Sequence, residues 1–364
     1  MTSWKTYKLG DVCSRLRSGR GIPASEVSTC GKFAVVGGNG VRGYTDTSNF
    51  NGQCVVVGRQ GAYCGNVRYF DGEFYMTEHA VVIVGNELAD THFLAYLLST
   101  MHLGQLSAQS AQPGLSVQTL SKLEIFLPSL EEQRRIAGIL GAIDDKIENN
   151  RRINTNLELQ AQALFDKWCE SCSKNITIKE LADNILDYTP NANSEVVLLN
   201  SSDVTQGVFA KLPLVSNVNL KGQFKKRFQK GDILYSEIRP RNKHYAYCYF
   251  DSDKYIASTR LIILRGKKEK IVSNTLLYQY LISQNVFEEF TLKTETRSGT
   301  FPQGNYQDLS SIVVPYSDNQ REIAGVLDSI YKRIWHNNTE VDNLATLRDT
   351  LLPKLMNGEI KIDE

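Results

Sequence analysis

The sequence has no excess of either charge and contains no long hydrophobic run. Its 364 residues include 41 Lys and Arg against 40 Asp and Glu. A net charge near zero argues against a strongly basic protein that coats nucleic acid. No run of 18 apolar residues occurs, so we expect no membrane span. Residues 1–9 (MTSWKTYKL) lack the pattern of a secretory signal. We therefore expect a cytoplasmic protein with two or three globular domains.

Recognisable catalytic and metal-binding motifs are also missing. The sequence has no P-loop, no GxSxG turn, no HExxH group and no Asn/Asp-Pro-Pro-aromatic signature of an amino-methyltransferase. Cys169 and Cys172 form an isolated CxxC, which without a second pair does not make a zinc site. Residues 38–43 fit GxGxxG, but residues 44–50 have the composition of a turn and strand where a dinucleotide site needs a helix. We expect this chain to bind no metal and no cofactor.

The second half of the chain repeats the first. Residues 133–140 read QRRIAGIL, and residues 320–327 read QREIAGVL. A short apolar run that ends in proline precedes each copy, at 125–128 and 312–315. The order is therefore domain, helix, domain, helix. We place these four segments at 1–128, 129–172, 173–316 and 317–364.

Both helical segments carry apolar residues in a heptad pattern, which predicts a coiled coil between them. The alternative is that each helix packs separately on its own domain. Asparagines in the middle of the seam reduce stability but can fix the register. The first seam contains Ile136, Leu140, Ile143, Ile147, Asn150, Leu157 and Leu164, and the second contains Ile323, Leu327, Ile330, Ile334, Asn337, Leu344 and Leu351.

The length of the first helix predicts the direction of the second. A helix of about 40 residues is roughly 60 Å long. It ends near Glu170, and the following domain of about 140 residues has a radius of gyration near 14 Å. That domain is too small for the second helix, which starts near Ser317, to begin beside the start of the first. The two helices should therefore run antiparallel.

The two domains read as mixtures of strands and helices. Short apolar runs bounded by Gly, Asn and Asp predict strands, and each domain has one helical stretch, at about 91–101 and 275–290. We predict an α+β fold with two mixed α/β domains, separated by two long antiparallel helices in a pseudo-two-fold tandem repeat. The predicted strands include 33–36, 54–57, 80–84, 232–235, 245–250 and 261–264.

Basic and aromatic residues concentrate between residues 221 and 245. Such a strip suits phosphate contact, although a solvated strand-and-loop face is the alternative. In the first domain, the loop 58–63 (GRQGAY) joins glycines, which allow close backbone approach, to Arg and Gln, which read base edges. The candidate DNA contacts are Arg59, Gln60, Arg68, Arg239, Arg241, Lys243, Arg260 and Arg297, and phosphate roles suit Lys225, Lys226 and Lys230.

Together these features resemble the specificity subunit of Type I restriction-modification systems. The resemblance rests mainly on residues 127–136 (LPSLEEQRRI) with the helix after them, on their repeat from 314 to 355, and on the terminal LLPKLMNGEI at 351–360. GRQG at 58–61 followed by GNV at 65–67 is similar to the family's glycine loop. The second domain departs from that loop, since residues 237–242 read EIRPRN.

The resemblance implies a protein that reads DNA without being an enzyme. Each domain would be a target-recognition domain for one half of a bipartite, asymmetric site in double-stranded DNA. Domains on one face of the duplex would favour a spacing of about one turn, ~34–36 Å. The helices would dock two modification (methyltransferase) subunits and the restriction subunits. Those partners would carry S-adenosylmethionine, ATP and Mg.

Two other functions stay open at this point. One is a self-sufficient methyltransferase or nuclease with an unrecognised site. The other is a scaffold, in which the helices and the two domains bind other proteins.

Overall fold

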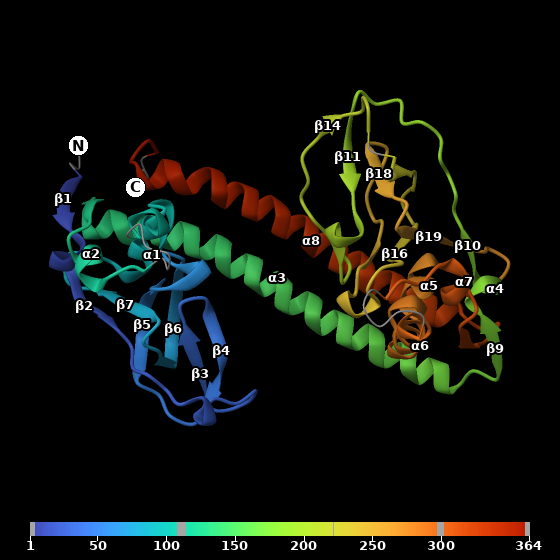
Figure 1. Cartoon of the computed structure of the whole chain (residues 1–364), viewed down its shortest axis with the longest axis horizontal. Helices are drawn as coiled ribbons and strands as arrows, with labels where there is room; N and C mark the ends of the chain where they lie inside the picture. Colours follow the sequence, from blue (N-terminus) through green and yellow to red (C-terminus); the bar gives the residue numbers. More distant parts are fainter. Residues whose placement is uncertain (1–3, 108–113, 221, 297–301, 361–364) are drawn as a thin grey trace. The chain divides into compact units, whose positions relative to one another are not determined.

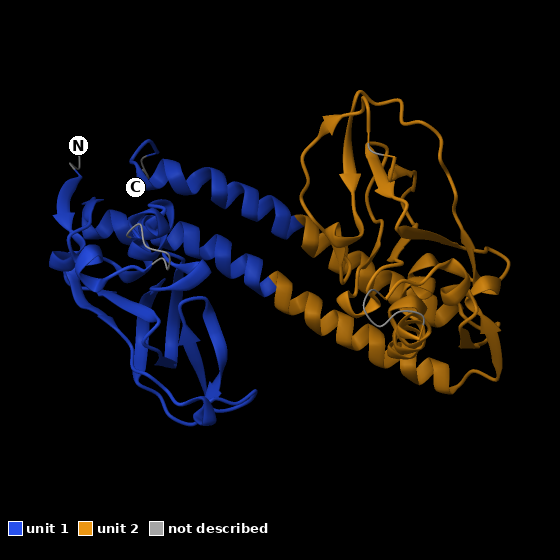
Figure 2. Ribbon diagram, viewed as in Figure 1, with its two compact units in different colours: residues 1–149, 340–364 blue, residues 150–339 orange. Residues whose placement is uncertain are grey.

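The computed structural model describes residues 4–107, 114–220, 222–296 and 302–360. The chain forms two compact units, drawn in different colours in Figure 2. The first unit is Met1–Asn149 together with Glu340–Glu364, and the second unit is Asn150–Thr339. Each unit therefore contains one of the predicted domains and part of each long helix. No helix in the described part of the chain is long and apolar enough to cross a bilayer.

A six-stranded sheet forms the centre of the first unit (Figure 1). Its neighbouring strands pair antiparallel except for the parallel pair of β3 and β6. A separate pair joins β1 (Lys5–Lys8) to β8 (Glu124–Leu127) just before the long helix. The order in the sheet is β2 (Cys13–Ser18), β7 (Ala80–Gly85), β5 (Phe50–Gly58), β6 (Val67–Met76), β3 (Phe33–Gly37) and β4 (Gly40–Thr45). The helical elements are η1 (Leu9–Val12), η2 (Ala24–Glu26), η3 (Gly61–Tyr63), α1 (Thr91–Thr100), η4 (Leu103–Leu106) and α2 (Val117–Ser121).

Period-two alternation gives this sheet two buried faces, because successive side chains of a strand point to opposite sides. Val55 and Val57 of β5 pack with α1 in one cluster. Cys54 and Val56 of the same strand belong to a second cluster. That second cluster also contains Val36, Met76, Ala80 and Val82. The strands predicted at 33–36, 54–57 and 80–84 and the helix predicted at 91–101 are therefore confirmed.

The second unit contains two four-stranded sheets. It also has the pair of β9 (Lys174–Thr177) and β20 (Val313–Tyr316) and the short hairpin of β12 (Val204–Thr205) and β13 (Val208–Phe209). The first sheet has the order β10 (Ala182–Asn184), β19 (Leu261–Gly266), β16 (Ile233–Ser236), β17 (Tyr245–Tyr247). The second has the order β14 (Val215–Ser216), β11 (Glu195–Leu199), β18 (Tyr255–Ser258), β15 (Phe224–Lys226). The helical elements are α4 (Ile178–Leu181), η5 (Ser201–Asp203), η6 (Pro240–Asn242), α5 (Asn274–Ile282), α6 (Gln284–Glu295) and α7 (Tyr306–Ser310).

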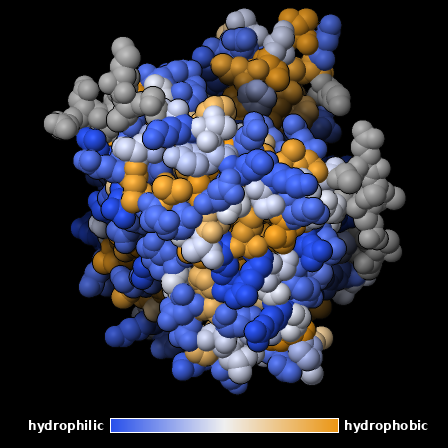
Figure 3. All heavy atoms as spheres, turned by 90° about the vertical axis from the view of Figure 1, so that its left-hand side faces the viewer, coloured by the Kyte–Doolittle hydropathy of each residue, from blue (hydrophilic) through white to orange (hydrophobic). Residues whose placement is uncertain are grey.

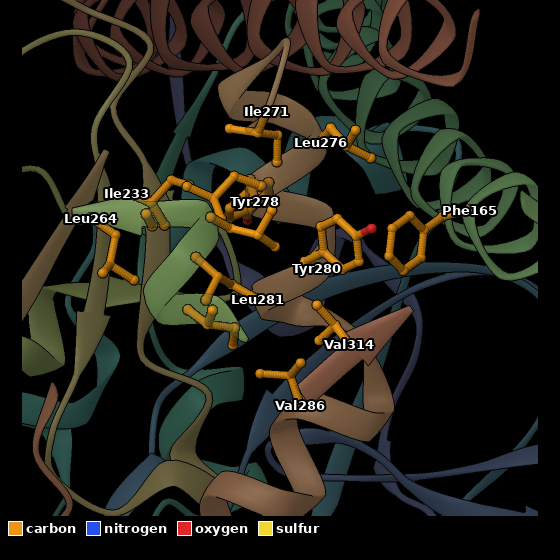
Figure 4. Packing of buried hydrophobic residues seen from close by; sticks show 14 of the residues in the cluster. Phe165, Ile233, Leu264, Ile271, Leu276, Tyr278, Tyr280, Leu281, Val286 and Val314 are labelled. Atoms are coloured by element: carbon orange, nitrogen blue, oxygen red, sulfur yellow. The ribbon is translucent and has the colours of Figure 1, made fainter. Parts of the chain in front are cut away.

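The helix predicted at 275–290 is two helices. Ser283 has φ −61° and ψ 148°, an extended conformation that ends α5 and starts α6. Tyr280 of α5 packs edge-to-face on Phe165, with ring centroids 4.9 Å apart (Figure 4). Ile233 and Leu264 belong to the same cluster, so the first sheet, α5 and the long helix share one core.

The long helices are α3 (Leu130–Glu170) and α8 (Arg321–Met356), and they pair antiparallel within each unit. In the first unit, Asp144 contacts Arg348 and Lys146 contacts Glu340. In the second, α3 residue Asn154 contacts Asn337, and Trp168, later in α3, donates to the carbonyl of Asn319, which precedes α8. The predicted direction of the helices and the α+β fold are confirmed.

Most of the predicted seam is buried or half-buried, and one position is wrong. Leu164 is 42% exposed, whereas Phe165 is 2% exposed. A straight α-helix drifts about 20° per heptad from a 3.5-residue repeat, which amounts to about 80° over the four heptads from Ile136 to Leu164. Phe165 has therefore moved onto the buried face. The fully buried seam residues are Ile136, Leu140, Ile147, Asn150, Ile323, Leu327, Ile334 and Asn337, and the half-buried ones are Ile143, Leu157, Ile330, Leu344 and Leu351.

Candidate nucleic-acid interface

The glycine loop of the first unit connects β5 to β6 and is closed by backbone hydrogen bonds. Gly58 N–H donates to the carbonyl of Asn66, and Gly65 N–H donates to the carbonyl of Gly58, both at 2.8 Å. Gly65 has φ +82°, and a Cβ there would lie 2.1 Å from the nitrogen of Gly104. Only glycine fits this close approach. The loop is thus held tightly against the segment that contains η4.

This loop places the predicted base-reading residues at one end of the sheet. Arg59 is held by its backbone, since its N–H donates to His79 at 3.0 Å and its carbonyl accepts from Leu115 at 2.8 Å. Its side chain is half-buried, while Gln60 and Arg68 are exposed. Arg68, at the start of β6, lines a hollow of about 690 Å³ together with Asn39, Asn66, His102 and Gln105.

Three arginines in or just after β2, the strand whose last residue lies at the same end of the sheet, were not predicted as site residues. They are Arg15 and Arg17 of β2 and Arg20 just after it. Ser18 pairs with Val81 in β7, and Ala80 of β7 pairs with Gly58 of β5, so the end of β2 lies beside the end of β5. The residues 15–17 read Arg-Leu-Arg, a strand pattern with basic residues on one face, which was the signal available in the sequence.

The loop between β16 and β17 holds the corresponding position in the second unit. Arg239 and Lys243 have φ +46° and +53°. Arg239 N–H donates to the carbonyl of Pro302 at 2.9 Å, which fixes the loop. Arg241 and Glu295 form a two-bonded ion pair, with Nη2 donating to Oε2 at 2.9 Å, and this pair lowers the pKa of Glu295. Lys243 Nζ lies 5.2 Å from the ring centre of Phe287.

The basic strip at 221–245 does not form one continuous face. Lys225 belongs to β15 in the second sheet, Lys230 precedes β16, and Arg239 follows β16. Lys225 and Lys230 are exposed, as is Arg260, whose carbonyl accepts from Glu237 N–H at 3.0 Å. Arg297 lies outside the described residues.

The role expected of Lys226 must be corrected. Its side chain is 5% exposed, and Nζ donates to the carbonyl of Leu261 at 2.7 Å. Burial also lowers the pKa of this lysine. A buried ammonium that already donates to the backbone does not suit phosphate contact. Lys225, its neighbour in β15, is exposed.

The structure also places the two motifs that we set aside in the sequence. Residues 38–39 form the turn between β3 and β4, so a hairpin follows where a dinucleotide site needs a helix. Cys169 and Cys172 are free thiols at the end of α3, and burial raises the pKa of Cys169 to about 12. Among the described residues, no group of three or more His, Cys, Asp or Glu is arranged to hold a metal ion.

Comparison with known proteins identifies relatives of this chain among Type I restriction enzyme specificity subunits. A specificity subunit of the Type I restriction enzyme EcoprrI from Escherichia coli is 39% identical over 144 residues, which are 38% of this chain and 36% of the relative. The MjaIX specificity subunit from Methanocaldococcus jannaschii is 24% identical over 310 residues, 75% of this chain and 70% of the relative. The match with the E. coli protein thus spans little more than a third of that protein's length.

The fold has a counterpart among solved structures. The crystal structure of a Type I restriction-modification S subunit from M. genitalium superposes with a TM-score of 0.71 at 19% identity, over 97% of this chain and 96% of the other. At that identity the likeness concerns the fold alone. The family model described as the Type I restriction modification DNA specificity domain matches residues 1–159 and 173–344. Since these matches cover most of the sequence, the chain belongs to the Type I restriction modification DNA specificity domain family.

Proposed function

We propose that this chain is the DNA-reading subunit of a Type I restriction-modification complex and recognises a bipartite, asymmetric site. The observation that carries the proposal is that both units have a loop at the equivalent place in their sheets, and that the side chains of the two loops differ. In the first unit the loop between β5 and β6 begins Arg59-Gln60-Gly61, and in the second the loop between β16 and β17 contains Arg239-Pro240-Arg241. Different side chains at equivalent positions read different bases. The two DNA tracts should therefore differ.

The chemistry of modification and restriction would lie in partner subunits. We propose two modification subunits, which would carry S-adenosylmethionine, and restriction subunits that would use ATP and Mg. This chain would then be non-catalytic and would supply sequence recognition. Because its ligand would be chromosomal DNA, the protein would act in the cytoplasm.

The exposed apolar residues of the long helices support a docking role. Leu159 is 65% and Leu164 is 42% exposed on α3 in the second unit. Ile139 is 40% and Leu347 is 46% exposed in the first unit. The face drawn in Figure 3 is mainly hydrophilic, with hydrophobic residues in small groups. Contiguous exposed apolar surface favours an interface with another protein, and these residues would contribute to such a surface.

Methylation-site sequencing of cells with and without the gene tests the proposal directly. We expect one bipartite adenine-methylation motif to disappear with the gene. In vitro, the chain with its modification subunits should shift a duplex that contains this motif and bind random DNA more weakly. Binding of radiolabelled S-adenosylmethionine to the isolated chain would instead support a self-sufficient enzyme. A complex that assembles but shows no DNA preference would support the scaffold.

A further inference from the structure

A small cleft in the first unit is lined almost entirely by hydrogen-bond donors. Its volume is about 260 Å³, and it lies between β2 and the residues that precede β5. We name it the arginine cleft; its lining side chains are Arg15, Arg17, Ser18, Arg20, Ser48 and Asn49. Arg15 and Arg17 lie two residues apart in β2, so they point to the same face of the sheet.

Arg15 occupies the inner part of the cleft. Its guanidinium lies over the ring of Phe50, 5.0 Å from the centroid. Its Nε is buried and has no hydrogen-bond partner, and the same is true of Ser18 Oγ. Burial and the charges of Arg17 and Arg20 lower the pKa of Arg15. A buried donor without an acceptor costs about 1–3 kcal/mol of stability. The unpartnered Arg15 Nε therefore destabilises the protein when nothing is bound in the cleft.

Carboxylates near the cleft do not neutralise its charge. In the described part of the chain, no acidic side chain forms an ion pair with Arg15, Arg17 or Arg20. Glu73 accepts from Ser48 Oγ at 2.7 Å, so it is bound at the rim. The amide of Asn49 is used by the backbone of Met76, at 2.7 and 3.0 Å. Three like charges and two unpartnered polar atoms thus line a space that suits an anion.

We propose that the arginine cleft binds a backbone phosphate of DNA and so positions the first recognition domain on the duplex. The proposal rests on the DNA-reading function proposed above. Gly19 N–H donates to Ala80 at 3.1 Å, and Arg59 N–H donates to His79 at 3.0 Å, so the cleft and the glycine loop meet the same turn. Arginine binds phosphate through two parallel hydrogen bonds. A phosphate held here would place the base-reading residues Arg59 and Gln60 against the groove.

Salt-dependent DNA binding by the complex with modification subunits tests this assignment. Arg17→Gln/Arg20→Gln removes two exposed charges and should leave the fold intact. Each phosphate contact contributes about 0.9 to the slope of log K against log salt concentration. We expect the slope to become shallower by about one to two, with an unchanged ratio of specific to non-specific affinity. Arg15→Gln should do the same if its thermal unfolding matches that of the wild type.

Lys5→Gln/Lys8→Gln is the matched control, since it removes two exposed charges from β1 in the same unit. An equal loss of slope in the control would overturn the proposal in favour of a general charge effect. An unchanged slope in Arg17→Gln/Arg20→Gln would also overturn it, while the proposed function would stand. Failure of the wild-type complex to prefer its site would count against the proposed function itself.

Discussion

Asn337 of α8 donates a hydrogen bond from Nδ2 to Oδ1 of Asn154 in α3 at 2.8 Å, in a buried part of the helix pair. Asn154 in turn donates from Nδ2 to Oδ1 of Asn338 at 2.7 Å. Two polar side chains inside an apolar seam can form a hydrogen bond with each other only when the two residues lie opposite each other. The contact therefore specifies one register of the antiparallel pair, as one buried asparagine does in other coiled coils.

Replacing one asparagine should cost more than replacing both. Asn154→Leu leaves the Asn337 amide buried without its partner, and we expect a loss of about 1–3 kcal/mol in the free energy of unfolding. Asn154→Leu/Asn337→Leu should recover most of that loss, because no buried amide at the contact is then left unpaired. Urea unfolding of the single and double variants measures the coupling. Asn156→Leu, on the exposed side of α3, is the control and should change stability by less than about 0.5 kcal/mol.

The glutamine that begins each repeated segment, QRRIAGIL and QREIAGVL, makes equivalent hydrogen bonds to the backbone in each unit. Gln133 is fully buried; its Oε1 accepts from Asp90 N–H at 2.9 Å, and its Nε2 donates to the carbonyls of Leu88 and Pro128 at 3.0 Å. Gln320 is 2% exposed; its Oε1 accepts from Val272 N–H at 3.2 Å, and its Nε2 donates to Lys270 at 2.9 Å. Each glutamine ties the start of a long helix to the segment before the domain helix.

Gln133→Leu should destabilise the protein because it leaves buried backbone groups of the domain without their side-chain partner. We expect a loss of about 1–3 kcal/mol, measured as a lower urea midpoint at constant m-value. Gln320→Leu should give a loss of similar size. Gln118→Leu, at an exposed position of α2, provides the comparison. A loss no larger than that of Gln118→Leu would contradict the role assigned to the buried amides.

The sequence predicted the features that depend on local periodicity. The two long helices follow from their heptads, and the strands follow from short apolar runs bounded by turn residues. The direction of the helices follows from the length of the first helix and the size of the domain after it. The buried roles of Gln133 and Gln320 could not be predicted, since glutamine is usually exposed and all of their partners except Pro128 lie more than 40 residues away. The repeat marked these residues without indicating why they recur.

Side-chain direction explains the errors at the candidate interface. Lys225 and Lys226 were assigned the same role, but Lys225 is exposed in β15 whereas Lys226 is buried. Arg15 and Arg17 were overlooked because three arginines in six residues do not stand out in a chain of balanced charge. The position of the end of β2 beside the end of β5, where Arg59 follows, depends on the strand order β2-β7-β5, which no local pattern in the sequence encodes.

Arg59→Ala should relax recognition in one half of the DNA site only. If Arg59 makes two hydrogen bonds to a base, its loss should cost about 1–3 kcal/mol of discrimination at that base pair. Affinities for duplexes with single substitutions in each tract measure this effect. Arg241→Ala should act on the other tract. Equal losses of discrimination in both tracts after Arg59→Ala would contradict the assignment of one domain to one tract.

The exposed leucines of α3 should matter for assembly rather than for folding. Leu159→Glu/Leu164→Glu places two charges on the proposed docking surface of the second unit. We expect weaker binding of a modification subunit, measured by analytical ultracentrifugation, and little change in thermal unfolding. Leu292→Glu is a suitable control, since Leu292 is 64% exposed but belongs to α6 and not to a long helix. Assembly that is unimpaired in the double variant would remove α3 from the docking surface.

Lengthening both long helices together should change the spacing of the DNA site. Seven residues inserted after Asn149 and seven after Thr339 add one heptad to each helix and keep the seam in phase. Each helix grows by about 10.5 Å, which corresponds to about three base pairs at ~3.4 Å each. Methylation-site sequencing should show a longer unread gap between two unaltered tracts. The same insertion after Lys211, in an exposed segment between β13 and β14, should leave the gap as it is. Altered tracts with an unchanged gap would mean that the helices do not set the spacing.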